Sequence, residues 1–230
     1  MKFKCIGTGS KGNCYALTNS KDQVLLLDCG IRWKEIKRSL AYRIDNIVGC
    51  VVTHSHKDHS LSANDVEVSG IVTWKPYEVF ESYKRFGDFI VLPFAVPHDG
   101  VPCYGFFIKC DGQKLIYATD FEYIRNRFGK QRLNHMVIEC NYTDDIVFLD
   151  EAKTRHVLGG HASLETVKRL VAANLTDELT DVILVHASEM LDTERCVREI
   201  QEITGFKVNV CAAYAGFETE LNSKTQEGEL

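Results

Sequence analysis

The sequence is organised around the stretch Gly49-Cys-Val-Val-Thr-His-Ser-His-Lys-Asp-His-Ser60, an apolar run that ends in three histidines and an aspartate. Most residues of the segment 47–52 are β-branched, which predicts a buried strand. The polar residues behind it are spaced i, i+2, i+4 and i+5, whereas one helix face presents residues three and four positions apart. We therefore expect them on a loop at the carboxyl end of the strand, where α/β folds usually build their sites. These residues are His54, His56, Asp58 and His59.

Three imidazoles and one carboxylate within six residues form a metal-binding set. Imidazole combined with carboxylate suits Zn or Mn, with Fe as a further option, whereas Ca and Mg prefer oxygen ligands alone. The alternative is a solvated loop that carries its histidines by chance, and it is much the weaker interpretation. The stretch therefore predicts a transition-metal site.

Length and composition indicate a single globular domain over residues 1–230. The chain has 230 residues, enough for one well-packed core and short for two. Apolar residues make up 45% and charged residues 26%, which is ordinary for a globular protein. The formal net charge of −5 argues against a large nucleic-acid footprint but leaves room for a local basic patch.

The nine cysteines contain no Cys-x-x-Cys pair, and most of them fall inside apolar runs. This distribution predicts reduced, buried thiols. The N-terminal residues lack the apolar stretch of a signal peptide, and no run approaches the roughly 20 apolar residues of a membrane span. We expect a cytoplasmic protein without membrane association.

Hydrophobic periodicity and turn residues predict an alternation of strands and helices. We expect strands at 2–6, 14–18, 24–27, 47–52, 71–74, 89–96, 104–109, 114–118, 135–140, 182–185 and 208–212. We expect helices at 32–41, 77–86, 163–175 and a last one capped by Asp192, followed by a flexible tail over about 218–230.

The glycine-rich segment Gly7–Asn13 joins the first two expected strands. Glycines at these positions permit a tight turn with positive φ. A phosphate-binding loop is the alternative, but the segment precedes a strand and lacks the Gly-Lys-Ser/Thr ending of such loops. A hairpin turn is therefore the better interpretation.

Five apolar runs end in, or lead directly into, a group that can bind a metal or orient a ligand. Strand ends at one edge of a sheet bring together residues that are far apart in sequence. A single histidine after a strand is usually structural, but five such groups are hard to obtain by chance. They are Asp28, His54, His98, Asp120 and His186.

Residues 54–59 match the His-x-His-x-Asp-His signature of the metallo-β-lactamase superfamily, and the other four strand-end groups follow in its motif order. The chain resembles this superfamily from Lys2 to about Ala213, and it is most similar to the YycJ/WalJ-like branch. The resemblance implies an α/β fold of the αββα type, a four-layer sandwich of two mixed sheets with helices outside. The segments that carry the branch resemblance include Gly9–Cys14, Leu27–Gly30, Pro97–Asp99, Glu139–Tyr142, Gly160–Ser163 and Val185–Ser188.

The resemblance also implies two divalent metal ions and a role for each motif residue. The first ion would be held by His54, His56 and His98, the second by Asp58, His59 and His186. Asp120 would bridge both ions, and Asp28 would orient a ligand or the attacking water. Two ions about 3.5–4 Å apart can share a water, lower its pKa toward roughly 7 and stabilise the attacking and leaving oxygens.

His161 precedes an expected helix start and has two interpretations. It is a candidate to protonate the leaving group or to hold a phosphate, or it is a structural histidine at a helix entrance. Asp99 and Glu139 are further candidates near the same edge, with roles that the sequence leaves open. His135 and His156 match no metal motif, and we expect them to be structural.

The branch resemblance implies a DNA exonuclease, and one local feature supports a nucleic-acid substrate. Basic residues alternate with Tyr123 and Phe128 shortly after Asp120, and such a segment can track a phosphate backbone. A solvated loop that uses basic residues for solubility is the alternative. The candidate substrate-binding residues are Arg125, Arg127, Lys130, Arg132 and His161.

Other functions of the superfamily remain open or are disfavoured. The segment between Asp120 and His186 leaves no room for the inserted domain of an RNA-processing β-CASP enzyme, and the long arm of a transfer-RNA-processing relative is absent. Hydrolysis of a lactone, thioester or β-lactam stays open because the same activated water can attack a carbonyl carbon. A non-catalytic metal-bound interaction module is the last alternative, and the complete set of motif residues argues against it.

Overall fold

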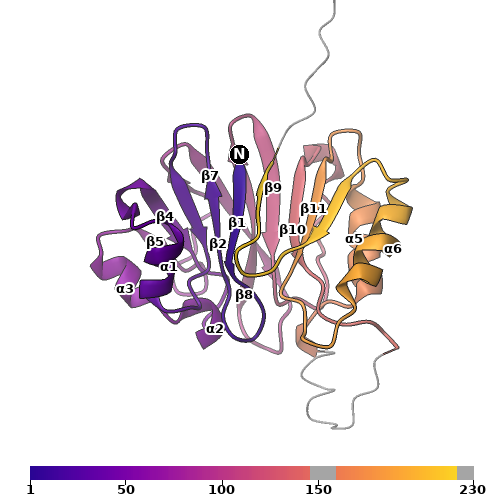
Figure 1. Cartoon of the computed structure of the whole chain (residues 1–230), viewed down its shortest axis with the longest axis horizontal. Coiled ribbons are helices and arrows are strands. Elements are labelled where there is room, and N and C mark those ends of the chain that lie inside the picture. Colours follow the sequence, from indigo (N-terminus) through magenta and orange to yellow (C-terminus); the bar gives the residue numbers. More distant parts are fainter. Residues whose placement is uncertain (146–158, 222–230) are drawn as a thin grey trace, which may run out of the picture.

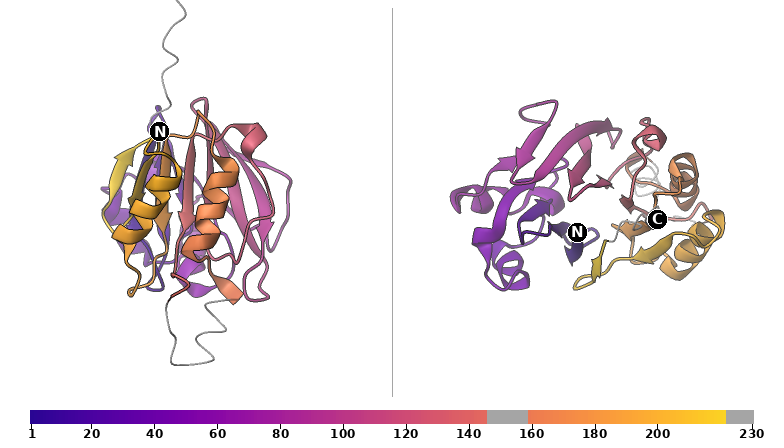
Figure 2. Two further views of the ribbon diagram at one scale, coloured as in Figure 1. Left: turned by 90° about the vertical axis from the view of Figure 1, so that its right-hand side faces the viewer. Right: turned by 90° about the horizontal axis from the view of Figure 1, so that it is seen from above.

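The computed structural model describes residues 1–145 and 159–221. Two β-sheets pack face to face and helices cover both outer faces, which gives the expected αββα sandwich (Figure 1). Helices α1 (Trp33–Ser39) and α3 (Ala63–Val68) lie on one side, and α5 (Leu164–Asn174) and α6 (Thr193–Ile203) on the other. Two further views show the same layers from the side and from above (Figure 2).

The first sheet has six strands in the order β13-β1-β2-β3-β4-β5. Strands β1 and β2 pair antiparallel, so the glycine-rich segment between them is a hairpin turn, as predicted. Strands β3, β4 and β5 run parallel to one another. The bounds are β1 Lys2–Gly7, β2 Cys14–Thr18, β3 Val24–Leu27, β4 Ile47–Val51, β5 Thr73–Trp74 and β13 Glu218–Glu220.

The second sheet has seven strands in the order β12-β11-β10-β9-β8-β7-β6. Strands β9 to β12 are parallel, whereas β6, β7 and β8 join by antiparallel pairs. The bounds are β6 Lys84–Phe86, β7 Phe89–Val96, β8 Cys103–Cys110, β9 Gln113–Ala118, β10 His135–Glu139, β11 Asp181–Val185 and β12 Asn209–Ala212. The carboxyl ends of β3, β4, β7, β9, β10 and β11 consequently meet at one edge of the sandwich, called here the metal edge.

The apolar core has three layers that follow from the period-two alternation of strand side chains. In β3, Leu25 and Leu27 face the other sheet, whereas Val24 and Leu26 face α1 and α3. The third layer packs α5 and α6 against the outer face of the second sheet. Both faces of the central strands β3, β10 and β11 are therefore buried, which holds their ends at the metal edge on a rigid support.

The helix expected at 77–86 is wrong. After Trp74 the chain turns and joins the second sheet as β6. It does so because Phe86 is buried against Gly49, where a Cβ atom would lie 2.0 Å from the Phe86 ring. Phe80 and Tyr83, expected to form an apolar stripe, are 62% and 60% exposed. Helical spacing alone provides no packing partner for these side chains, so the end of the segment pairs with the sheet and no helix forms.

The predicted flexible tail is wrong at its start. Residues Glu218–Glu220 form β13 and pair antiparallel with β1, and the Leu221 side chain is fully buried between the sheets. Lys2 and Lys4 contribute ion pairs to Glu218 at 2.7 and 3.3 Å, which add to the backbone pairing. Residues 222–230 lie outside the described part of the chain.

The nine cysteines are all unpaired, and eight of them are buried, in agreement with reduced core thiols. None of the helices in the described ranges 1–145 and 159–221 has the length and apolar character to cross a bilayer.

Candidate metal centre

The structure brings the five predicted strand-end residues together at the metal edge. Three of them have a left-handed backbone: φ is 58° at Asp28, 56° at Asp120 and 52° at His186. This region is uncommon for residues other than glycine, although Asp, Asn and His enter it more often than most, and it concentrates at functional sites. The sharp turn of the backbone directly after each strand places these side chains at the site.

A short helix, α2 (Lys57–Ser60), presents Asp58 and His59. The prediction of a loop is therefore correct for His54 but incomplete, because the chain turns into one helical turn for which His56 is the N-cap. The glycine-rich hairpin fixes this turn: Asn13 N–H donates to the Asp58 carbonyl at 2.7 Å. A Cβ at Gly30 would lie 1.6 Å from the same carbonyl oxygen, so only glycine permits this close packing.

The first predicted ligand trio forms one cluster. His54, His56 and His98 each offer a ligand atom, and these atoms lie within 4.8 Å of one another. His98 Nδ1 lies 2.7 Å from the Gly160 carbonyl, to which it donates, and Nε2 lies 3.2 Å from His56 Nδ1. The hydrogen bond to Gly160 thus fixes which His98 nitrogen faces the cluster.

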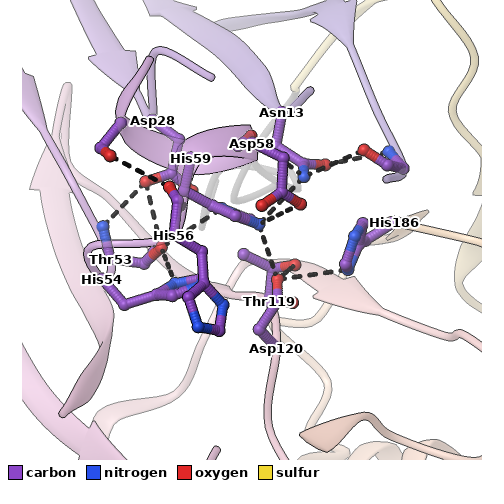
Figure 3. A network of polar contacts seen from close by, with 12 residues as sticks. Asn13, Asp28, Thr53, His54, His56, Asp58, His59, Thr119, Asp120 and His186 are labelled. Carbon is purple, nitrogen blue, oxygen red and sulfur yellow. Dashed lines mark hydrogen bonds and ion pairs between the residues drawn. The ribbon is translucent and has the colours of Figure 1, made fainter. Parts of the chain in front are cut away.

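The second predicted trio, Asp58, His59 and His186, forms a neighbouring cluster by the same criterion. Asp120 lies beside both trios: its Oδ2 is 3.0 Å from His59 Nε2 and 3.2 Å from His186 Nδ1, and its Oδ1 is 4.0 Å from His98 Nε2. Figure 3 shows Asp120 between His59 and His186. A carboxylate at this position can bridge two ions.

Asp28 holds His59 in place. Its Oδ2 accepts from His59 Nδ1 at 2.8 Å, and its Oδ1 accepts from the Thr53 backbone N–H at 2.8 Å (Figure 3). The Tyr117 hydroxyl also donates to Oδ2, at 2.6 Å. A carboxylate on the remote ring nitrogen fixes the tautomer and ring orientation of a metal-ligating histidine. Asp28 is fully buried and contacts His59 directly. No motif or spacing pointed to Tyr117.

Glu139 plays the corresponding part at the other side of the site. It is fully buried, and its Oε1 lies 2.6 Å from His161 Nδ1 and 3.1 Å from His186 Nδ1. His161 thereby lies at the metal edge, and the role expected for it stays a prediction. Asp99, by contrast, is exposed and does not line the pocket described below.

Burial and neighbouring charges shift the pKa values of the site residues in both directions; burial lowers the pKa of His59, for example, but Asp120 and Asp28 outweigh it and raise that pKa well above its usual value. Burial, reinforced by neighbouring His59, lowers the pKa of His54 to about 2. Burial opposes ionisation of Asp120, yet His186 and His59 hold the pKa of its carboxyl well below the usual value. Burial also opposes the charged form of His161, but Glu139 outweighs it and raises the pKa to about 9. A neutral imidazole and ionised carboxylates are the protonation states that bind metal ions.

Two nitrogen atoms support the fit to metal ions. Among the side chains that the structure describes, His54 Nε2 and His186 Nε2 are buried and have no hydrogen-bond partner. An unpartnered buried nitrogen is costly unless another group satisfies it. Ions held by the two trios would satisfy this need, and the imidazole-rich donor set suits Zn, Mn or Fe.

A pocket of about 450 Å³ opens over the two trios. Its lining includes His56, Asp58 and His161 together with Lys57 and Lys11. Lys11 forms an exposed ion pair with Glu189 at 2.7 Å. The sequence interpretation missed both lysines, although Lys57 lies within the histidine motif and Lys11 within the glycine-rich turn.

The predicted basic segment lies elsewhere. None of Arg125, Arg127, Lys130 and Arg132 lines this pocket. Arg125 and Arg127 line a separate groove beside α5, and Lys130 lies in the short helix η2 (Gly129–Gln131). Arg132 forms an ion pair with Glu178 at 2.7 Å. His156 lies outside the described residues.

His135 is buried at the opposite edge of the second sheet, where Asp181 and Gln113 bind its two ring nitrogens at 2.8 Å each. This arrangement agrees with the structural role expected for it.

Comparisons with known proteins find similar sequences and a similar fold. Residues 7–73 match the family model of the metallo-beta-lactamase superfamily. The chain is 26% identical to exodeoxyribonuclease YycJ of Bacillus anthracis, with 98% of each chain covered. It is 27% identical to exodeoxyribonuclease WalJ of Streptococcus pneumoniae, over 88% of this chain and 86% of that protein. The crystal structure of YhfI from Bacillus subtilis, a metallo-beta-lactamase fold protein, superposes with a TM-score of 0.76 at 17% identity, over 95% of this chain and 98% of that one.

Proposed function

We propose that this chain, which contains a domain of the metallo-beta-lactamase superfamily, is a two-metal phosphodiesterase that degrades DNA from strand ends. The observation that carries the proposal is the pair of ligand trios with Asp120 between them, beneath an open pocket with two lysines in its lining. The resemblance to two exodeoxyribonucleases supports DNA as the substrate class.

His54, His56 and His98 would hold one ion, and Asp58, His59 and His186 the other, with Asp120 shared. Bound there, two divalent ions supply an activated water and positive charge for a phosphoryl group. Asp28 keeps His59 Nε2 directed at the site through its bond to Nδ1. Glu139 does the same for the His186 ring.

His161 is placed to serve the leaving group. Its Nδ1 is bound to Glu139 at 2.6 Å, so Nε2 is the ring atom that can reach a substrate in the pocket. A histidine oriented in this way can carry a proton to a leaving alkoxide oxygen, as a general acid. We assign this role to His161 Nε2, with Glu139 as the residue that positions the ring.

Two lysines give the pocket its preference for a phosphate. Lys57 and Lys11 lie in the pocket lining; the Lys57 ammonium can contact the oxygens of an anionic diester, and that of Lys11 can do so by exchanging its exposed ion pair with Glu189. A neutral ester, thioester or lactone would gain little from them. Arg125, Arg127, Lys130 and Arg132 are proposed to contact the substrate strand beyond this pocket.

The test is incubation of the purified protein with Mn or Zn and end-labelled duplex DNA, single-stranded DNA and RNA, alongside a thioester and a lactone. Release of mononucleotides from DNA supports the proposal. The Asp120→Asn variant is the control for a contaminating nuclease. Turnover of the small esters alone, without release of nucleotides, would reject DNA as the substrate.

A further inference from the structure

A groove of about 310 Å³ lies beside α5, outside the metal pocket. One wall is the segment 123–127, and the other is the face of α5 that carries Thr166, Arg169 and Asn174. This volume falls within the range of ligand-binding pockets, roughly 300–1,000 Å³. Neither the metal ligands nor Glu139 line the groove.

The groove leads away from the metal edge. Its segment begins three residues after Asp120 and is held there because Glu122 N–H donates to the Pro97 carbonyl, next to His98. At the other end, Phe128 N–H donates to Asn174 Oδ1 at the last residue of α5. From Thr166 to Asn174 the helix rises about 12 Å. In the left view of Figure 2, α5 faces the viewer.

Three arginines line this groove without a carboxylate partner. Arg127 and Arg169 have no ion pair within the described residues, and Arg125 donates only to the Tyr123 hydroxyl, at 3.0 Å. No acidic side chain is among the described residues of the lining. Three uncompensated guanidinium groups on a protein of net charge −5 mark a local site for an anion.

The groove also offers stacking and apolar surface. The Arg125 guanidinium lies 5.6 Å from the centre of the Tyr123 ring, which is 40% exposed. Ile124, Leu170 and Ala173 form apolar patches between the charges. Aromatic rings and planar guanidinium groups stack on unpaired bases, while arginines contact the phosphates between them.

We propose that this groove binds the sugar-phosphate backbone of a single nucleic-acid strand and leads that strand to the metal pocket. The inference rests on the proposed function, because it places the groove on the path of the substrate of that pocket. An acidic peptide would match the charges but would make less use of the ring of Tyr123. The test therefore compares the two anions.

The binding experiment uses the full chain carrying Asp120→Asn, which prevents cleavage, and a fluorescein-labelled single-stranded oligothymidylate of about 12 nucleotides. Anisotropy titrations are run between about 50 and 200 mM salt. The triple variant Arg125→Gln, Arg127→Gln and Arg169→Gln is expected to raise Kd at least about tenfold at the lowest salt. Its slope of log K against log salt should be smaller by roughly 0.7 for each lost phosphate contact.

The matched control removes three exposed charges outside the lining of the groove, by Arg38→Gln, Arg43→Gln and Lys207→Gln. An equal loss of binding in both triple variants would overturn the proposal, because it would reflect net charge alone. Unchanged binding in the groove variant would overturn it as well. If polyglutamate of equal charge displaces the oligonucleotide as well as unlabelled strand does, the groove is not a nucleic-acid site.

Two safeguards keep the outcomes separate. If the triple variant does not fold, as judged by circular dichroism, the single variants Arg127→Gln and Arg169→Gln carry the same test, each with a slope change of roughly 0.7. The unmodified protein is assayed in parallel with Mn or Zn on DNA and on a small phosphodiester. Absence of turnover there rejects the proposed function, whereas the groove stands or falls on the binding data.

Discussion

At the metal edge, His59 Nδ1 lies 2.8 Å from Asp28 Oδ2; at the opposite edge, His135 Nδ1 lies 2.8 Å from Asp181 Oδ2. Both histidines are fully buried. The difference lies in the second ring nitrogen. For His135, Nε2 is bound to the Gln113 amide oxygen at 2.8 Å, whereas His59 Nε2 faces the carboxylates Asp58 and Asp120 at 3.4 and 3.0 Å as well as the Asn13 amide nitrogen at 3.0 Å.

The comparison shows that a histidine–carboxylate pair says little about function until the other ring nitrogen is traced. The cluster around His135 closes on itself: Thr180 donates to Asp181 Oδ2, the oxygen that His135 also binds, and Asn209 donates to Oδ1. The metal edge leaves two buried histidine nitrogens, of His54 and His186, without a partner among the described groups. The cluster around His135 stabilises the fold, whereas the cluster at the metal edge keeps ring nitrogens that can bind a metal ion.

Replacement of the shared carboxylate should have the largest effect. We expect Asp120→Asn to lower the rate of hydrolysis by at least about 10³-fold, because transition-state charge stabilisation by metal sites is worth several kcal/mol. His56→Ala should have a similar effect. Rates on labelled DNA and metal content by mass spectrometry are the measurements. Full activity of either variant after metal reconstitution would contradict a two-metal site.

Removal of metal should lower the stability provided by the metal edge and leave the edge around His135 unaffected. Ions that bind only the folded state stabilise it by about 2.7 kcal/mol at a hundredfold excess over Kd. We expect chelation to lower Tm and Zn or Mn to restore it. His135→Ala should keep this response, whereas His56→Ala should lose most of it. A Tm that is indifferent to metal in the unmodified protein would argue against ions at the trios.

Asp28 and Asp181, the carboxylates that orient His59 and His135, provide a matched pair of variants. Asp28→Asn should lower metal affinity or activity about 10–100-fold, the usual cost of losing a partner of a ligating histidine. Asp181→Asn should leave metal affinity unchanged. Isothermal titration with Zn measures both variants, and equal affinities would remove the distinction between the pairs.

Truncation of His135 should cost stability without affecting hydrolysis. His135→Ala leaves Gln113 and Asp181 buried without their partner, at about 1–3 kcal/mol. Urea unfolding of the metal-loaded protein is the measurement. A variant of unchanged stability would show that the cluster does not support the fold.

The smallest effect concerns pH. Burial disfavours the charged form of Asp181, but hydrogen bonds from His135 and Asn209 lower the pKa of its carboxyl below 3.8. This contribution to stability is present above pH 3.8 and is lost as the pH falls toward the folded-state pKa. Between about pH 5 and 3, Asp181→Asn should therefore lose less stability than the unmodified protein. Parallel urea midpoints in that range test the sign.

The sequence predicted the metal edge well because its residues directly follow apolar runs. Asp28, His54 and Asp120 could be placed at one edge from strand ends alone, since parallel strands deliver their carboxyl ends together. Asp58 and His59 were predicted in the right place but on the wrong local structure, because a single helical turn carries too little periodicity to be seen.

The failures have a common physical cause. The segment 77–86 has helical spacing, but burial of Phe86 against Gly49 decides its conformation, and that contact spans the two sheets. Lys57 and Lys11 line the pocket through tertiary packing that has no periodic signal. Arg169 joins the basic groove from a helix more than 40 residues after Arg125, so a search of the basic segment alone could not find it.

The left-handed backbone at Asp28, Asp120 and His186 also restricts how this chain can diverge. A β-branched or bulky residue at such a position adds about 1–2 kcal/mol of strain, whether or not a metal is bound. Asparagine and glycine avoid most of that strain. A descendant that no longer bound metal would not need ligands at these positions, but the left-handed backbone would still disfavour β-branched and bulky residues there. Substitutions at these three turns would therefore favour Asn and Gly, and the left-handed turns would remain in the backbone after metal binding was lost.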